Sequence, residues 1–370
     1  MVSGSWLMVN NCQQIFLELL QGGLWGKEVR LLPFGEIDYA AILKLAEEQS
    51  VVGLVAAGLE HVKDVKVPQE WALQFAGQTL QLEQRNKAMN AFVAKLIEDL
   101  RKADVYCLLV KGQGVAQCYE KPLWRASGDV DLLLSKDNYE KAKACLTPQA
   151  GQVEEEDEEK MHLGLTIDGW LVELHGTLYT CFSKKINRLI DSVQHSIFCG
   201  GEVRSWDNGG TVVYLPSADN DVILVFTHIL EHFFIEGVGI RQICDWCRLL
   251  YCYREKLDLR VLESRIRKVG LMKEWKAFAS LAVDWLGMPK EAMPFYDERF
   301  SQKGVGVLKL VMEAGNFGHN KDLSYRIRYK GTTYKVVSLW RRMKDFVRFI
   351  PLFPLDVPRF FVTYVLGKVK

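Results

Sequence analysis

The segment that most constrains the fold is 105–134, which reads VYCLLVKGQGVAQCYEKPLWRASGDVDLLL. It begins with an apolar run, 105–110, that is too short for a helix and rich in strand-forming residue types. A glycine-containing turn, 111–114, follows, and we expect it to open a short helix that ends near residue 119. Residues 128–134 are apolar again and predict a second strand.

The second strand carries two acidic residues two positions apart. Side chains two apart on a strand point to the same face, so Asp129 and Asp131 lie together while Val130, Leu132 and Leu134 line the buried face. Two adjacent carboxylates on a half-buried strand repel each other, and a divalent cation removes that cost. An exposed acidic pair on an edge strand is the alternative, but aspartate is disfavoured in strands. The pair therefore predicts a Mg²⁺ site, with Mn²⁺ as the alternative cation.

The turn between the strands has the composition of a phosphate-binding turn. Gly112 and Gly114 carry no side chains, so backbone N–H groups at the start of the helix can approach a phosphate closely. Lys111 in the turn and Arg125 just before the acidic strand are candidates to pair with phosphate charge, although each can equally be a solvated cation. A phosphate-binding turn followed by paired carboxylates is typical of phosphoryl or nucleotidyl transfer.

A third carboxylate is expected from a β-hairpin further along the chain. Residues 162–167 and 170–175 alternate apolar and polar residues on either side of an Asp-Gly pair, which is a strong hairpin signal. Glu173 and His175 share one face of the second hairpin strand. We expect Glu173 to lie beside Asp129 and Asp131, as a third metal ligand or as a general base, with His175 supporting it.

A later helical segment carries polar residues that can reach the same site. His228 and His232 are four apart and therefore lie on one helix face. Two histidines do not complete a zinc site, so we favour hydrogen-bonded histidines where the helices meet the sheet. Arg241 and Asp245, on the next helix, can join these histidines or contact a nucleotide.

These motifs together resemble the nucleotidyltransferase superfamily of DNA polymerase β and the aminoglycoside nucleotidyltransferases. More narrowly, residues 105–250 are similar to a bacterial family of uncharacterised nucleotidyltransferases. The similarity lies in a Lys-Gly after the first strand, an Arg, an Asp-Val-Asp strand, a later Val-Glu-Leu-His strand and a helical segment with two histidines and an aspartate. The resemblance implies an α+β fold with a small mixed β-sheet flanked by helices. It also implies transfer of a nucleoside monophosphate from a nucleoside triphosphate, ATP among them, to an acceptor hydroxyl or phosphate.

The position of these motifs in the 370-residue chain predicts how the chain divides into regions. We expect an N-terminal helical region at 1–103 that packs on the catalytic sheet, a catalytic domain at 104–216, a C-terminal helical domain at 217–335, and a basic-aromatic tail at 336–370. No apolar run is long enough to span a membrane. Nine scattered cysteines and the lack of a basic, signal-like start favour a cytoplasmic protein.

Two other functional classes remain open at this level. The chain can be a degenerate relative that only binds a nucleotide or serves as a scaffold, or a toxin-like enzyme that nucleotidylates tRNA or protein. A net charge of +1 does not indicate nucleic-acid binding. The tail can make weak contact with an anionic membrane surface, although its prolines forbid one continuous amphipathic helix and a tail that wraps the protein is favoured.

Overall fold

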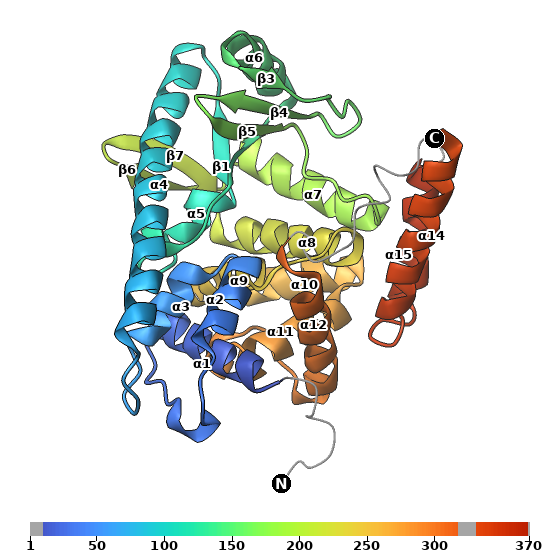
Figure 1. Ribbon diagram of the computed structural model, residues 1–370. Coiled ribbons are helices and arrows are strands. Elements are labelled where there is room, and N and C mark those ends of the chain that lie inside the picture. Colours follow the sequence, from blue (N-terminus) through green and yellow to red (C-terminus); the bar gives the residue numbers. More distant parts are fainter. Residues whose placement is uncertain (1–9, 317–330, 369–370) are drawn as a thin grey trace.

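The computed structural model describes residues 10–316 and 331–368. A five-stranded mixed sheet, in the order β1-β2-β5-β4-β3, lies in the upper part of Figure 1. The neighbouring strands β2 and β5 are parallel, and the other neighbours are antiparallel. The strands are β1 (Cys107–Val110), β2 (Asp129–Leu134), β3 (Gln152–Val153), β4 (His162–Ile167) and β5 (Trp170–His175). This is the small mixed sheet that the sequence predicts.

The hairpin β4–β5 forms around the expected Asp-Gly turn. Asp168 and Gly169 both have positive φ, 50° and 80°, as a two-residue hairpin turn requires. This turn fixes the register, which places His162 opposite His175. The parallel pairing of β5 with β2 places Glu173 opposite Asp131. The two pairings together place His162, His175, Glu173 and Asp131 on neighbouring strands.

One hydrophobic core lies on the buried face of this sheet. Val130, Leu132 and Leu134 of β2 are at most 1% exposed, which leaves the two aspartates on the other face. The C-terminal half of the long helix α4 (Gln69–Lys102) and helix α6 (Lys136–Leu146) cover this core. A separate hairpin adds Val213 and Leu215 to it. The hairpin strands are β6 (Val203–Asn208) and β7 (Thr211–Pro216).

A second, larger core joins helices from the two ends of the chain. Its N-terminal helices are α1 (Asn11–Trp25), α2 (Tyr39–Glu48) and α3 (Val52–Leu59). The later helices are α5 (Gly112–Ala116), α7 (Lys184–Phe198), α8 (Ala218–Ile235), α9 (Ile240–Tyr253), α10 (Leu259–Val269), α11 (Met272–Asp284) and α12 (Ser301–Ala314). In Figure 1 the blue helices α1–α3 lie beside α9 and α11, below the sheet.

The N-terminal helices differ in what they pack against. The C-terminal half of α4 covers the buried face of the sheet. Helix α1 instead contacts the end of the later helical region, where Gln21, Trp25 and Lys27 donate side-chain hydrogen bonds to backbone carbonyls of residues 285–287. The apolar faces of α1–α3 have no sequence feature that distinguishes a helical partner from a sheet, so the sequence alone did not decide between them.

The C-terminal segment forms two helices, α14 (Gly331–Phe349) and α15 (Asp356–Lys368). The boundary expected at 336 therefore falls inside α14. Aromatic contacts join this pair to the larger core, with ring centroids 4.8 Å apart both for Phe349 with Phe233 and for Phe360 with Phe182. Within the described part of the chain, no helix is both long and apolar enough to cross a membrane.

Candidate active site

Three carboxylates meet on the face of the sheet opposite its core. Asp129 and Asp131 come from β2 and Glu173 from β5, and one oxygen of each lies within 4.8 Å of the others. Asp131 is only 3% exposed, whereas Asp129 at the strand end is half-buried. The charge on Asp131, followed by burial, raises the pKa of Asp129. The group is thus a concentration of negative charge with hard oxygen donors, as Mg²⁺ or Mn²⁺ requires.

Two side-chain nitrogen atoms contact Asp131. Lys111 Nζ and His175 Nε2 each lie 2.8 Å from the same carboxylate oxygen, Oδ1. Burial opposes ionisation of this carboxyl, but the Lys111 charge and the hydrogen bond from His175 outweigh it and lower its pKa. Asp131 is therefore the ionised centre of the group.

Glu173 receives a second set of contacts that the sequence analysis did not include. His162 Nε2 lies 3.4 Å and His175 Nε2 3.3 Å from Glu173 Oε2. His162, Glu173 and His175 form a second group in which all three donor atoms lie within 4.8 Å of one another. The sequence did contain a signal for His162, because counting outward from the Asp-Gly turn pairs it with His175.

Two adjoining cavities border these side chains. The smaller, of about 120 Å³, is lined by Asp129, Asp131, Gly112 and Arg241 among others. The larger, of about 360 Å³, extends along β4, β5 and α8. The two share four lining residues, which are Lys111, Glu173, His228 and His232. The carboxylates of β2 thus face the smaller cavity, and Glu173 faces both.

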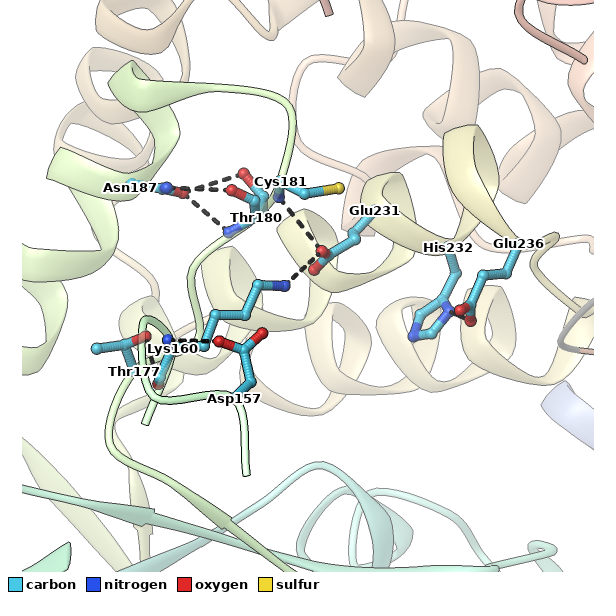
Figure 2. Close-up of polar contacts among 9 residues, drawn as sticks. All are labelled: Asp157, Lys160, Thr177, Thr180, Cys181, Asn187, Glu231, His232 and Glu236. Atoms are coloured by element: carbon cyan, nitrogen blue, oxygen red, sulfur yellow. Dashed lines mark hydrogen bonds and ion pairs between the residues drawn. The ribbon is translucent and has the colours of Figure 1, made fainter. Parts of the chain in front are cut away.

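The wall of the larger cavity is held by a network between the β3–β4 loop and α8 (Figure 2). Lys160 Nζ lies 3.2 Å from Glu231 Oε1, which also accepts a 3.3 Å hydrogen bond from the backbone N–H of Cys181. The backbone of Lys160 is fixed by Asp157 on one side and by Thr177 on the other. These contacts join three separate chain segments around the cavity.

The glycine turn divides its residues between the cavity and the protein interior. Gly112, with a φ of +37°, lines the smaller cavity at the start of α5. Gly114 does not line it, and a Cβ there would lie 2.7 Å from Leu215 Cδ2. Gln113 is buried between them, and its Nε2 donates to Asn86 Oδ1 of α4 at 3.1 Å. A side chain at position 114 would therefore require Leu215 of β7 to shift.

Arg125 lines the smaller cavity, and its contact with phosphate stays a prediction. Its guanidinium is buried and forms a two-point ion pair with Asp245 of α9, at 3.0 Å from Nε to Oδ1 and 2.6 Å from Nη2 to Oδ2. Asp245 also accepts a 2.7 Å hydrogen bond from Tyr119. Arg241 donates to the carbonyl of Ala126 at 2.9 Å. Arg125 and Asp245 therefore satisfy each other and hold the loop before β2 against α9.

The two histidines of α8 lie where the cavities meet. Their ring centroids are 4.3 Å apart, and His232 Nδ1 lies 3.1 Å from Glu236 Oε2 (Figure 2). Burial, followed by the Lys111 charge, lowers the pKa of His228 well below its usual range, so that ring is neutral. Across residues 10–316 and 331–368, neither group of clustered potential metal ligands includes His228 or His232. The structural role that the sequence favours for this pair stays a prediction.

Comparison with known proteins gives one family. A family model described as "Uncharacterised nucleotidyltransferase" matches residues 35–287, which includes every site residue named above. Neither the curated proteins nor the solved structures contain a match.

Proposed function

The chain belongs to the uncharacterised nucleotidyltransferase family, and from that premise we propose that it transfers a nucleoside monophosphate from a nucleoside triphosphate to an acceptor hydroxyl or phosphate. An acceptor oxygen attacks the α-phosphorus, and pyrophosphate leaves. The observation that carries this proposal is the convergence of Asp129, Asp131 and Glu173 on one face of two paired strands. The Lys111 ammonium offsets part of this negative charge, and a divalent cation would offset the rest.

The carboxylates fit a hard divalent cation by charge and donor type. Asp129, Asp131 and Glu173 would hold Mg²⁺ or Mn²⁺, which when bound supplies charge neutralisation at the phosphates. The like-charge repulsion that raises the pKa of Asp129 supports this assignment. Glu173 has two possible roles, as the third ligand or as the base that takes the proton of the acceptor hydroxyl.

The other residues of the smaller cavity are assigned to the triphosphate. The Lys111 ammonium lies beside Asp131 at the cavity wall, where it can pair with a phosphate oxygen. Gly112 lets the backbone approach a phosphate closely. Arg241 lines the same cavity and is the guanidinium we assign to phosphate in place of Arg125. The acceptor then enters from the larger cavity, which Glu173 also borders.

The test is calorimetric titration of the full chain with Mg²⁺ complexes of ATP, GTP, CTP and UTP. We expect at least one to bind, and the Asp129→Asn variant to weaken that binding at least about tenfold, because it removes a charged ligand without changing side-chain volume. Asp137→Asn, an exposed aspartate on α6, is the matched control and should bind like the wild type.

Binding without a requirement for Mg²⁺, or binding that is equal in Asp129→Asn and wild type, would contradict the proposed cation site. If a folded wild-type protein bound no triphosphate, the enzyme assignment would fail and a scaffold role would replace it. Circular dichroism of each variant separates loss of binding from loss of folding.

A further inference from the structure

The larger cavity collects imidazole side chains. Four of the chain's seven histidines, His162, His175, His228 and His232, line it. They come from the β4–β5 hairpin and from α8. The nucleotidyl-transfer proposal uses none of the four as a ligand or as a proton carrier, so their concentration around one cavity calls for a separate explanation.

Two of these rings are directed at one oxygen atom. The hairpin register sets His162 opposite His175, with ring centroids 4.8 Å apart. Both present Nε2 to Glu173 Oε2, at 3.4 Å and 3.3 Å. Charge-assisted hydrogen bonds between nitrogen and carboxylate oxygen are shorter, about 2.7–2.9 Å. His175 Nε2 makes a shorter, 2.8 Å contact with Asp131 Oδ1, but both separations from Glu173 Oε2 exceed this range.

Those separations agree with the geometry of a coordinated metal ion. For tetrahedral bonds of about 2.0–2.1 Å, neighbouring ligand atoms are about 3.3–3.4 Å apart. Two imidazole nitrogens and one carboxylate oxygen favour a borderline transition metal over Mg²⁺, which prefers oxygen ligands. We propose that His162, Glu173 and His175 form a second cation site, specific for a transition-metal ion of the zinc class.

The proposed ligands supply three positions, and the larger cavity borders all of them. Zinc sites with three protein ligands and one open position are typical of ions that bind a water or a substrate oxygen, whereas structural sites are closed by four. Glu173 belongs to both candidate metal groups, so the second ion would lie next to the carboxylates of β2. The ligand for the open position is thus an oxygen donor that enters through the larger cavity.

This inference goes beyond nucleotidyl transfer, because metal binding to the two histidines requires no triphosphate. The discriminating residue is His162, which belongs to the histidine group and not to the carboxylate group. Its side chain is 31% exposed, whereas that of His175 is 9% exposed and contacts Asp131. Substitution of His162 therefore tests the site with the smaller risk to folding.

The experiment titrates metal-free full-length protein with Co²⁺, whose visible absorption reports coordination, and then displaces it with Zn²⁺. We expect one Co²⁺ to bind per chain. Near-ultraviolet thiolate bands, which would indicate binding to any of the chain's nine cysteines, should be absent. His162→Gln should weaken Zn²⁺ binding by more than about tenfold, since even loss of an outer-shell partner costs that much. His228→Gln and His232→Gln are matched controls from the same cavity and should retain the spectrum.

Failure of wild-type protein to bind Co²⁺ or Zn²⁺, or an unchanged affinity in His162→Gln, would overturn the second site. Loss of the cobalt spectrum in Asp129→Asn would also overturn it, because the ion would then occupy the carboxylate group. Mg²⁺-triphosphate titrations on the same preparations keep the two proposals apart. A protein that binds Mg²⁺-triphosphate but no Zn²⁺ refutes only the histidine site, and the reverse result refutes only the proposed function.

Discussion

Asp245 and Arg125 are a pair of buried, opposite charges next to the candidate active site. Their side chains are 7% and 4% exposed, and each depends on the other for neutralisation. Replacing only one partner of a buried ion pair leaves an uncompensated charge, which typically costs about 3–5 kcal/mol. This ion pair is therefore one of the contacts that hold the loop before β2.

Asp245→Asn should lower the free energy of unfolding by about 3 kcal/mol, because the amide keeps the shape of the side chain but not its charge. Urea denaturation followed by fluorescence measures the change. The double variant Arg125→Met/Asp245→Asn should recover part of the loss, since no buried charge then lacks its partner. A single variant as stable as wild type would mean that Arg125 is not held by Asp245.

Some contacts between individual residues can be predicted from the sequence, and others cannot. Asp129, Asp131 and Glu173 were expected together because strand periodicity and a two-residue turn fix their faces. The partner of Arg125 was not predicted, since Asp245 lies 120 positions away and only the packing of α9 brings them together. Local periodicity determines which way a side chain points from its strand, but not which distant helix meets it.

At the scale of elements, the junction of α11 with α15 contains a buried acid. Glu274, in the first turn of α11, is fully buried, and the neighbouring Asp356 begins α15. Burial, followed by the charge of Asp356, raises the pKa of Glu274 from 4.5 to about 8. The folded protein therefore keeps this carboxyl protonated at a pH where the unfolded chain has lost the proton.

Because the folded state binds the extra proton, the free energy of unfolding should fall as pH rises between about 4.5 and 8. The expected contribution of Glu274 between pH 5 and pH 8 is roughly 3 kcal/mol. Glu274→Gln should remove this dependence and be more stable than wild type at pH 8.

Urea denaturation across that pH range measures the difference between the two proteins. Glu291→Gln, an exposed glutamate that follows α11, is the matched control and should keep the wild-type profile. Parallel pH profiles for wild type and Glu274→Gln would show that Glu274 ionises normally in the folded protein.

Element prediction succeeded where a local signal existed. The hairpin β4–β5 forms where the Asp-Gly pair predicts it. The buried stripe of α4 differs from its simple apolar spacing, because Leu80 is 58% exposed while Asn86 is fully buried. Asn86 is buried because its amide donates to the carbonyls of Leu123 and Arg125, and no hydrophobicity pattern marks such a position.

At the scale of the whole molecule, Arg248 of α9 joins segments from three parts of the chain. Its Nε donates to the carbonyl of Cys118 at 2.9 Å, and Nη1 donates to the carbonyl of Leu24 at 2.7 Å. The guanidinium also lies over the Trp25 ring, 5.2 Å from its centroid. Arg248 therefore links α9 both to α1 and to the segment that follows α5.

Arg248→Lys should lower the free energy of unfolding by about 2 kcal/mol, because one ammonium cannot make both hydrogen bonds or stack on the ring. Calorimetry should still record one transition, as the shared core couples the two ends of the chain. Arg254→Lys, exposed just beyond the end of α9, is the matched control. Separate melting of an N-terminal unit would contradict this coupling.

The contacts of α9 with the segment before β2 suggest a way to inhibit the protein. Three residues of α9, Arg241, Asp245 and Arg248, contact the segment 118–126, which runs directly into β2. A compound that displaced α9 from this segment would pull the segment with it or break the contacts, and in either case the carboxylates of β2 would lose their support. Such a compound need not occupy either cavity, so it would not compete with a ligand bound there.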